Sequence, residues 1–470
     1  MRTRTKARLV AFLFIILCLV PVIGAAATTD PAPDQSVAEL RATATDVTFI
    51  STQGGSVHVY DHAGKVVAIH TPTQQEIWRN NDYRRYMDID PIGSDRLLFV
   101  AGERDADGSG FHRVAVVVNW RTGEELTKFK VPGSTHDIDY LGDGRYAIAA
   151  LRDHEALIYN ASSETTTWRF DFRNHYPPYP QAGGEGWDWT HLNDIDSVHN
   201  ESAFLLSPRN FDRVILVDKE TKEVRWTLGE ENNYDIINEQ HNPVLLTDSP
   251  PTVLVADSEN DRIVEYRRTG GDWQLVWEYT GELNWPRDAD RLPNGHTLVT
   301  DSSGDRVLEV TPSREIVWEY EIERGPYDAE RLQYGDEPAG PSMVKFSDSF
   351  ASPRHTISTP GAIDVLTIRF DATLDTIYQL VGGWILPVGA GRGVFPFALL
   401  ATLGLIGWIG AEVAIRLPAE RLAGRLRREG EKRVLSLAAG TVALVFGAGV
   451  LALVLESGGL TGIYVAIGLS

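Results

Sequence analysis

The pattern of apolar and polar residues separates two kinds of segment along the chain. Three stretches are apolar over about 20 residues, the length that crosses a bilayer. They run from Leu9 to Ala27, from Val394 to Ile415 and from Val434 to Leu455. Between the first and the second, apolar and polar residues alternate in short runs interrupted by Asn-Gly, Asp-Gly and Ser-Gly pairs. The pattern therefore predicts transmembrane helices near both ends and an all-β domain between them.

A repeat organises the middle region. Six segments, which we call anchors, place an acidic or polar pair before an apolar residue, and they recur at intervals of 40 to 57 residues. The anchors are Met87–Asp90, His136–Asp139, Asn193–Asp196, His241–Val244, Arg287–Asp290 and Tyr327–Glu330. Four short antiparallel strands per unit of this length are typical of a β-propeller blade. We expect the Asp-x-Asp pairs to hydrogen-bond backbone amides between blades, with Ca²⁺ binding as the alternative.

The two ends of the repeat region are each incomplete. Val47–Trp78 reads as three strands with no anchor before them, whereas the last anchor, near Glu330, has no full set of strands after it. We therefore expect the two ends to complete one blade and close a six-bladed ring, which leaves no long edge strand exposed. Tryptophans often end the outer strands: Trp78, Trp168, Trp226, Trp277 and Trp318. A β-sandwich, or two smaller all-β domains, is the alternative.

Charge is distributed unevenly along the 470 residues, which carry a formal net charge of −21. Residues 1–28 hold four basic and no acidic residues, and residues 393–470 hold seven basic and five acidic ones. The middle, 29–392, thus has 33 basic against 60 acidic residues, a net of −27. This argues against nucleic-acid binding. Only 8 of the 44 basic residues are Lys, and acidity with few lysines is typical of proteins from high-salt organisms.

The basic residues also predict a topology. Seven of them lie in the loop 416–433, and the positive-inside rule places this loop and the N-terminus in the cytoplasm. We expect a multi-pass protein of the cell membrane whose propeller faces the exterior. Its parts are an anchor or signal peptide (1–28), a propeller (29–340), a linker with a helix near 362–380 (341–392), and a region with two transmembrane helices (393–470). The single cysteine, Cys18, excludes an intramolecular disulfide.

Histidines stand out among the candidate functional residues. His136, His191 and His241 lie at or beside three successive anchors, and we expect them at equivalent positions in successive blades. Because the inner strands of a propeller surround one central channel, these side chains should converge there. The alternative for each is a turn histidine that is satisfied by local hydrogen bonds.

The segment Trp187–Asn193, followed by Ser207–Asn210 and then by Gln240-His241, resembles the arylsulfate sulfotransferase family over roughly residues 130–330. The most specific part is His191 and Asn193 with Arg209 sixteen residues beyond the asparagine. The resemblance implies an exported six-bladed propeller that moves a sulfuryl group from a phenolic sulfate to a phenol. It also implies a sulfohistidine intermediate, no nucleotide donor, and His241 as the nucleophile. His136 would correspond to a further active-site histidine.

The chemistry of sulfuryl transfer suits these residue types. Imidazole is neutral near pH 7, attacks well and can leave again. A guanidinium fork can hold the sulfuryl oxygens, so Arg209 is the expected clamp, with Asn193 and His136 as secondary donors. His191 is the expected acid and base for the phenolic oxygen. An ion pair between blades is the alternative for Arg209.

Aromatic residues complete the predicted site. Trp187, Trp189 and Trp285 are expected to stack on the phenolic ring, although each could instead pack the surrounding loops. The expected partners are an aryl sulfate, a phenolic acceptor and the lipid bilayer, with no metal and no cofactor. Taken with the composition, we expect a membrane-anchored member of haloarchaeal type. The alternative is a non-enzymatic exterior propeller that binds an anionic or glycan ligand or a protein partner.

Overall fold

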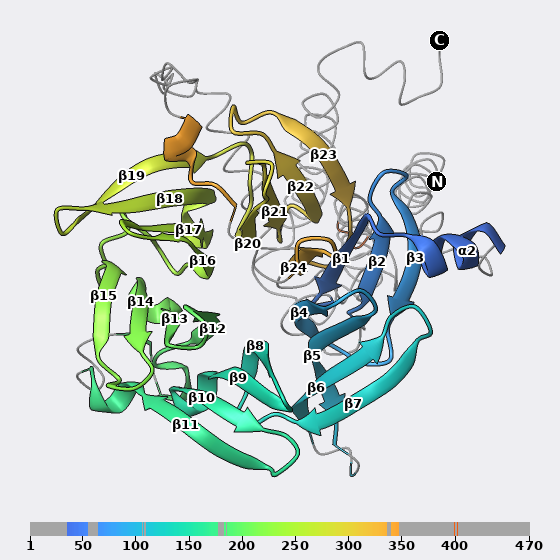
Figure 1. The fold of residues 1–470 in the computed structure, drawn as a ribbon, viewed down its shortest axis with the longest axis horizontal. Helices are drawn as coiled ribbons and strands as arrows, with labels where there is room; N and C mark the ends of the chain where they lie inside the picture. The colour runs from blue at the N-terminus through green and yellow to red at the C-terminus, as the bar shows by residue number, and fades with distance from the viewer. Residues whose placement is uncertain are drawn as a thin grey trace, which may run out of the picture. The chain divides into compact units, whose positions relative to one another are not determined.

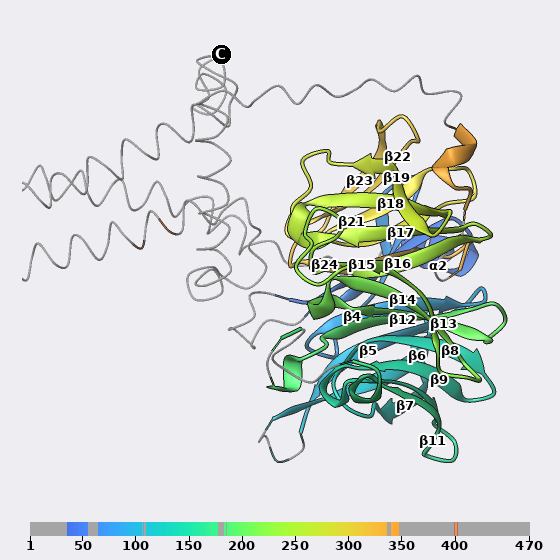
Figure 2. The same cartoon turned by 90° about the vertical axis from the view of Figure 1, so that its left-hand side faces the viewer.

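The computed structural model describes residues 35–54, 64–105, 107, 110–176, 183–184, 186–335 and 340–346, with residues 399 and 402. The described strands form six four-stranded sheets around a central axis, as the sequence predicts (Figure 1). Figure 2 shows the same strands edge-on. We number these blades in chain order and call the strand nearest the axis the inner strand.

Every blade is an antiparallel sheet of consecutive strands, except for the first. Blade 1 contains β24 (Pro326–Arg331), β1 (Val47–Thr52), β2 (Val66–His70) and β3 (Gln75–Asn80). Blade 2 contains β4 (Tyr86–Ile92), β5 (Arg96–Arg104), β6 (Phe111–Asn119) and β7 (Glu124–Lys130). Blade 3 contains β8 (Thr135–Gly142), β9 (Arg145–Ala150), β10 (Glu155–Asn160) and β11 (Thr165–Asp171).

The second half repeats this arrangement. Blade 4 contains β12 (Leu192–Val198), β13 (Ala203–Pro208), β14 (Arg213–Asp218) and β15 (Val224–Gly229). Blade 5 contains β16 (His241–Asp248), β17 (Pro251–Asp257), β18 (Arg262–Thr269) and β19 (Asp272–Tyr279). Blade 6 contains β20 (Pro286–Arg291), β21 (Thr297–Asp301), β22 (Arg306–Val310) and β23 (Ile316–Glu321).

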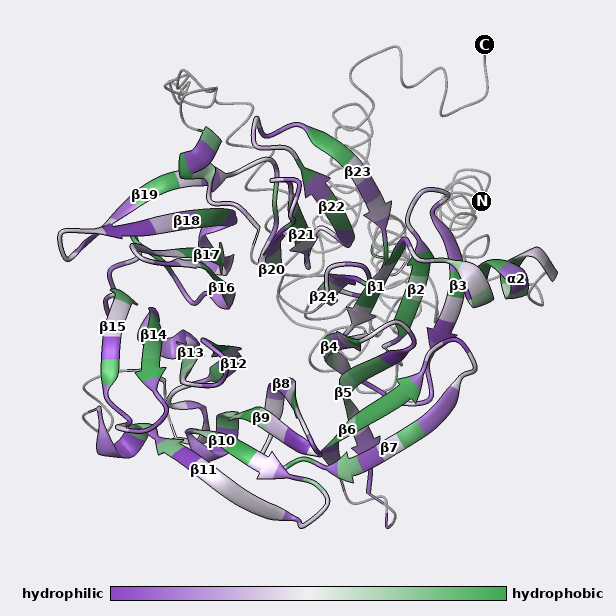
Figure 3. Cartoon of the chain, viewed as in Figure 1, coloured by the Kyte–Doolittle hydropathy of each residue, from purple (hydrophilic) through white to green (hydrophobic). Residues whose placement is uncertain are grey.

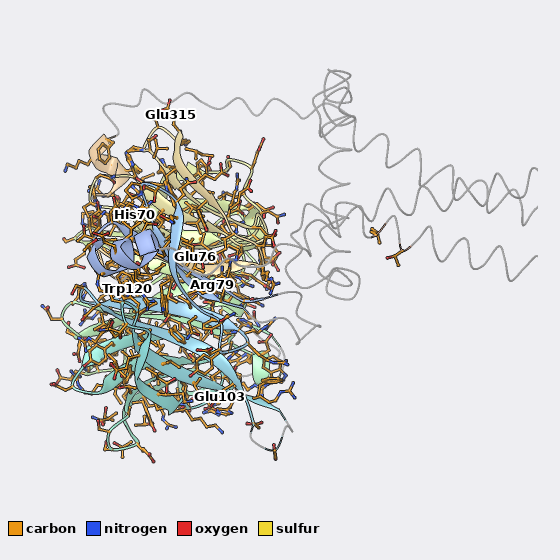
Figure 4. All side chains as sticks on the ribbon, turned by 90° about the vertical axis from the view of Figure 1, so that its right-hand side faces the viewer. His70, Glu76, Arg79, Glu103, Trp120 and Glu315 are labelled. Atoms are coloured by element: carbon orange, nitrogen blue, oxygen red, sulfur yellow. The ribbon has the colours of Figure 1, made fainter. Side chains whose placement is uncertain are left out.

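Short helices flank or connect the strands. They are α2 (Gln35–Thr43) and the 3₁₀ turns η1 (Leu151–Asp153), η2 (Phe172–Asn174), η3 (Gly186–Asp188), η4 (Arg209–Phe211), η5 (Ser258–Asn260) and η6 (Met343–Phe346). Helix α2 packs beside Trp120 (Figure 4), where the Nε of Arg41 donates to the Trp120 carbonyl at 3.0 Å. On the outer strand β3, Arg79 donates to Glu76 at 3.1 Å.

Ring closure follows the prediction. The last strand, β24, pairs antiparallel with the first, β1, in the register Thr48 to Arg331 and Ile50 to Ala329. The two ends of the repeat region therefore share blade 1, and β24 supplies its inner strand (Figure 1). Pairing strands that lie so far apart in sequence removes two exposed edges at once.

The core lies between the faces of neighbouring blades. Middle strands such as β6 and β14 are largely hydrophobic and buried, whereas the outer strand β7 is mostly exposed (Figure 3). Tryptophans on outer strands also join blades. The indole N–H of Trp168 donates to the Lys219 carbonyl of blade 4 at 2.7 Å, and that of Trp318 donates to the Thr71 carbonyl at the edge of blade 1 at 3.0 Å.

Aspartates of the anchors link the inner strands. The backbone N–H of Ile89 donates to Asp328 at 2.8 Å, and that of Ile138 donates to Asp88 at 3.1 Å. Ile195 makes the same bond to Asp137. Each carboxylate thus accepts from the next blade along the chain or, for Asp328, across the closure. The predicted hydrogen bonds between blades are confirmed.

We expect Asp137→Ala to lower the free energy of unfolding by about 1–3 kcal/mol, because the buried N–H of Ile195 loses its acceptor. Asp137→Asn keeps an acceptor oxygen and should cost less. Burial raises the pKa of Asp137 to about 7, above its value of about 4 in the unfolded chain. The folded state therefore binds the proton more tightly, and stability falls as pH rises from about 4 to 7.

The fall in stability between about pH 4 and 7 that Asp137 causes should disappear in Asp137→Asn, because an amide does not titrate. Denaturant unfolding of the full-length protein at about pH 5 and about pH 8 measures both effects. Equal losses in the alanine and asparagine variants would contradict the role of Asp137 as an acceptor between blades.

The remaining predicted parts lie outside the described residues. These are the apolar segments 9–27, 394–415 (apart from residues 399 and 402) and 434–455, and the linker helix near 362–380. Among the described residues, no helix has the length and apolar character needed to cross a membrane. Residues 340–346, which follow blade 1 in the chain, contact blade 5, where the N–H of Met343 donates to Glu265 at 3.0 Å. The described propeller belongs to one compact unit, 31–367, and the other unit, 1–30 with 368–470, contributes only residues 399 and 402.

Candidate active site

The start of each inner strand presents one residue of a repeated position. This residue is the second of its strand in five blades and the first in blade 5, so that the six are Met87, His136, Asn193, His241, Arg287 and Tyr327. We call these six residues the channel ring. Two residues before them, the backbone adopts a positive φ at His191, Glu239, Trp285 and Gly325. These four residues therefore share a second repeated position, two residues before the channel ring.

Side chains from both positions form a continuous cluster. The ring of His136 lies 5.2 Å from that of His191 and 5.9 Å from that of Tyr327. The guanidinium carbon of Arg287 lies 4.9 Å from the centre of Tyr327 and 4.2 Å from the centre of Trp285. Trp285 in turn lies 5.8 Å from His241. Five blades thus contribute to one site.

The three predicted histidines are in this cluster, but their positions are not equivalent. His136 and His241 belong to the channel ring, whereas His191 precedes β12, and Asn193 holds the ring position of blade 4. The expectation of one shared position is therefore wrong. His191 reaches the site because its left-handed backbone, with φ of 42°, matches the conformation of Glu239 and Trp285.

His241 is held in a state suited to nucleophilic attack. It is 2 % exposed, and its Nδ1 lies 2.8 Å from the hydroxyl of Ser258. That hydroxyl also donates to the Ala256 carbonyl at 3.4 Å, so its oxygen can accept from Nδ1–H. The lone pair is then on Nε2. Burial lowers the pKa of His241 well below its usual value, and Arg287, Arg209 and His191 lower it further, so the ring is neutral at pH 7.

His191 is oriented by a carboxylate. Its Nδ1 lies 2.6 Å from Asp188, the last residue of η3, which leaves Nε2 free to exchange a proton. Burial lowers the pKa of His191, and the bond to Asp188 opposes this effect. Burial would raise the pKa of Asp188, but the hydrogen bond from His191 and nearby Arg209 hold it below its usual value. Asp188 is therefore an ionised partner that our sequence analysis missed.

Arg209 and Asn193 have partners within the protein. Arg209 forms a 3.1 Å ion pair with Glu239 of the next blade, and its Nε donates to Asn210 at 3.0 Å. The ion pair between blades, the alternative interpretation of Arg209, is thus present. The Nδ2 of Asn193 donates to the Gln240 carbonyl at 2.9 Å. In this arrangement one of the two N–H groups of the Asn193 amide positions the Gln240–His241 segment.

Arg287 is the cation that the sequence analysis overlooked. It is 8 % exposed, its Nε has no hydrogen-bond partner, and no carboxylate of the described residues lies within ion-pair distance. Burial lowers its pKa to about 10, so the guanidinium stays charged at pH 7. After burial, Arg287 has the largest effect on the pKa of His241. The repeat could have identified Arg287, because Arg287 and His136 begin equivalent anchors.

Tyr327 completes this side of the cluster. Its side chain is 1 % exposed, and its hydroxyl has no hydrogen-bond partner among the described residues. Burial raises the pKa of Tyr327 well above its usual value, so the phenol remains protonated and can only donate or accept as a neutral group. It is a hydrogen-bond donor beside Arg287.

The three predicted aromatic residues have different environments. Trp285 lies between His241 and Arg287. Trp187 is 60 % exposed, with the guanidinium carbon of Arg152 at 5.0 Å from its ring. Trp189 is only 5 % exposed and packs against His154 and Phe211 in the core between blades 3 and 4. The expectation that Trp189 stacks on a substrate is therefore wrong.

No group of three or more histidine, cysteine or carboxylate side chains in the described part of the chain is arranged to hold a metal ion. Fold and cluster together define a class: a six-bladed propeller with a buried histidine and arginine site at its centre. The model of the family Arylsulfotransferase (ASST) matches residues 35–275, and the chain belongs to this family.

Other comparisons concern the fold. No curated protein matches the chain. A protein of unknown function from Bacteroides caccae is 13 % identical, with a TM-score of 0.42, over 59 % of this chain and 93 % of its own. A periplasmic gluconolactonase from Pseudomonas aeruginosa is 13 % identical, with a TM-score of 0.41, over 61 % of this chain and 85 % of its own.

Proposed function

We propose that the propeller transfers a sulfuryl group from an aryl sulfate to a phenol through a sulfo group on His241. Family membership supports this class of reaction. The observation that carries the proposal is the environment of His241, which is buried, neutral, bound through Nδ1 to Ser258 and close to Arg287. A histidine that only stabilised the fold would not need a buried, unpaired arginine beside it.

In the first half of the reaction, the lone pair of His241 Nε2 attacks sulfur and forms an N–S bond. The bond between sulfur and the aryl oxygen breaks, and its electron pair goes to the oxygen. His191, when protonated, gives its Nε2 proton to that oxygen, and the phenol leaves. Arg287 and Tyr327 face the sulfuryl oxygens, and Arg209 can join them by exchanging Glu239 for the substrate.

The second half reverses these steps with another phenol. Neutral His191 accepts the proton of the acceptor hydroxyl, and the oxygen attacks sulfur. The N–S bond breaks and returns its electron pair to His241, so that both histidines regain their starting states. Asp188 keeps the Nε2 of His191 directed to the phenolic oxygen in both halves.

Mass spectrometry of the protein after exposure to a donor tests for the sulfohistidine intermediate. Full-length protein is exposed to 4-nitrophenyl sulfate without acceptor, and a sulfo group is sought on the peptide that contains His241. We expect it there, and we expect a phenol to remove it. Transfer that proceeds while the sulfo group forms on another residue, or on none, would contradict the proposal.

A change at Asp188 should act through His191. We expect Asp188→Asn to lower the transfer rate by up to about 100-fold, within the range of general acid–base catalysis. Because Asp188 raises the pKa of His191, its loss lowers that pKa, and the basic limb of the donor half-reaction should move to lower pH. The pH–rate profile measures this shift. An unshifted profile with a uniformly lower rate would contradict the assignment of His191.

We also propose that the protein is membrane-anchored, with the propeller outside the cytoplasm, and that its acidic surface is adapted to high salt. The apolar segments and the basic loop 416–433 support the topology. The net −27 of residues 29–392 supports the adaptation. Accessibility of propeller lysines to a membrane-impermeant reagent in whole cells tests the orientation, and labelling only after lysis would overturn it.

A further inference from the structure

The turns that follow the second strand of blades 4, 5 and 6 share one backbone contact. In blade 4, the N–H of Asn210 donates to the Thr190 carbonyl at 3.1 Å, and in blades 5 and 6 the N–H groups of Glu259 and Ser303 make the same bond at 3.3 and 3.0 Å. Each acceptor lies three residues before the channel ring. Because asparagine, glutamate and serine all supply this N–H, the fold requires the backbone at this position and not a particular side chain.

The side chain of Asn210 makes two further bonds, one to each part of the reacting site. Its Oδ1 accepts from the Nε of Arg209 at 3.0 Å, and its Nδ2 donates to the Asp188 carbonyl at 2.6 Å. The Nη2 of Arg209 pairs with Glu239 at 3.1 Å, and the carboxylate of Asp188 lies 2.6 Å from the Nδ1 of His191. One amide therefore joins the guanidinium to the acid–base pair. Its orientation is fixed, since a guanidinium only donates and a carbonyl only accepts.

The surroundings of Asn210 are closely packed. A Cβ added at Gly184 would clash with the Nδ2 of Asn210 and would lie 2.7 Å from the carbonyl oxygen of Asp188. The N–H of Gly184 donates to the Trp189 carbonyl at 2.8 Å, which holds this backbone against the amide. On the other side, Phe211 is fully buried in the core between blades 3 and 4. The amide is thus held firmly enough to fix the positions of both its partners.

We propose that Asn210 is a positioning residue that holds the guanidinium of Arg209 and the Asp188–His191 pair in a fixed relation to each other. This inference rests on the proposed function and names the residue that joins its anion clamp to its acid and base. The bond to Nε keeps the guanidinium plane fixed while Nη2 exchanges Glu239 for a sulfuryl oxygen. The bond to the carbonyl keeps η3 in place, so that Asp188 stays directed at the Nδ1 of His191.

The pKa of His191 tests this role independently of activity. Burial lowers this pKa, and the bond to Asp188 opposes that effect, so a loosened Asp188 should lower the pKa further. We expect this shift in Asn210→Ala, measured by NMR titration of histidine-labelled, full-length protein. The other charged and titratable groups around the His191 ring are Arg209, Glu239, His136 and His241.

A double variant separates positioning from a general loosening of the blade. Asp188→Asn alone should also lower the pKa of His191. In the Asp188→Asn background, Asn210→Ala should bring no further shift, because the carboxylate that Asn210 positions is already gone. A general loosening would change the pKa by the same amount in both backgrounds.

Transfer kinetics give a second readout. We expect Asn210→Ala to lower kcat by about 10-fold and to raise KM for 4-nitrophenyl sulfate by about 10-fold, because it disturbs the acid–base pair and the clamp together. Asn210→Ser, whose hydroxyl is too short to reach both partners, should show the same changes. The matched control is Asn119→Ala, which removes an asparagine that accepts from the N–H groups of Arg121 and Thr122 at 3.0 and 2.9 Å in blade 2. It should change neither kinetics nor the pKa of His191.

Two results would overturn the positioning role: an unchanged pKa of His191 in both Asn210 variants, or equal shifts with and without Asp188. If a sulfo group still forms on His241 of the unaltered protein, the proposed function stands in that case. If the unaltered protein transfers nothing, the proposed function fails, and the pKa of His191 still decides whether Asn210 positions Asp188.

Discussion

Replacing His241 with asparagine is expected to reduce sulfuryl transfer by roughly 10⁴- to 10⁶-fold, the range found when an enzyme loses its nucleophile. Asparagine can still hydrogen-bond Ser258, so the blade should fold. Release of 4-nitrophenol from its sulfate by the full-length protein measures the loss.

His296→Asn is the matched control for this experiment. His296 lies between β20 and β21, outside the cluster, and bonds Glu309 at 2.6 Å. We expect its replacement to leave transfer unchanged. Substantial activity in His241→Asn, with the control behaving as expected, would rule out His241 as the sulfuryl carrier and would favour a propeller that only binds an anionic ligand.

The second large effect is expected at Arg287. Arg287→Gln should lower kcat by about 10²- to 10³-fold, because it removes a fixed donor from the charge that develops on the sulfuryl oxygens. Arg287→Lys should recover only part, since an ammonium cannot reproduce the planar fork that stacks between Trp285 and Tyr327.

A pH profile separates this role from a structural one. Arg287 lowers the pKa of His241, so its removal should raise that pKa and reduce the neutral fraction of His241 at a given pH. The acid limb of the profile should therefore move to higher pH in Arg287→Gln. Arg314→Gln, on an exposed turn of the same blade, should change neither rate nor profile. An unshifted acid limb would show that Arg287 does not act on His241.

The site combines features that a purely structural cluster would avoid. Arg287 is buried with an Nε that has no hydrogen-bond partner among the described residues, and Tyr327 is buried with a hydroxyl that has none. Such groups usually cost stability, and they are retained where function needs them. Arg209 differs, because it forms an ion pair with Glu239.

Much of the candidate site was visible in the repeat. The anchors predicted which residues start the inner strands, and four of the six residues in the channel ring, His136, His241, Arg287 and Tyr327, contact or influence one another in the structure. The sequence analysis selected histidines for their chemistry and so identified His136 and His241. It did not identify Arg287 and Tyr327, which occupy the same position in their own anchors. Our sequence analysis singled out neither Ser258 nor Asp188, so only their contacts with His241 and His191 revealed them.

The sequence by itself determined the number of blades, the shared closing blade and the residues at the start of each inner strand. These follow from strand alternation, which is local, and from a repeat that returns every 40 to 57 residues. Only the tertiary structure decided which cations are compensated: Arg209 meets Glu239, whereas Arg287 meets the aromatic rings of Trp285 and Tyr327. The physical reason is that pairing between blades depends on how neighbouring sheets are rotated about the axis, which no local pattern of residues encodes.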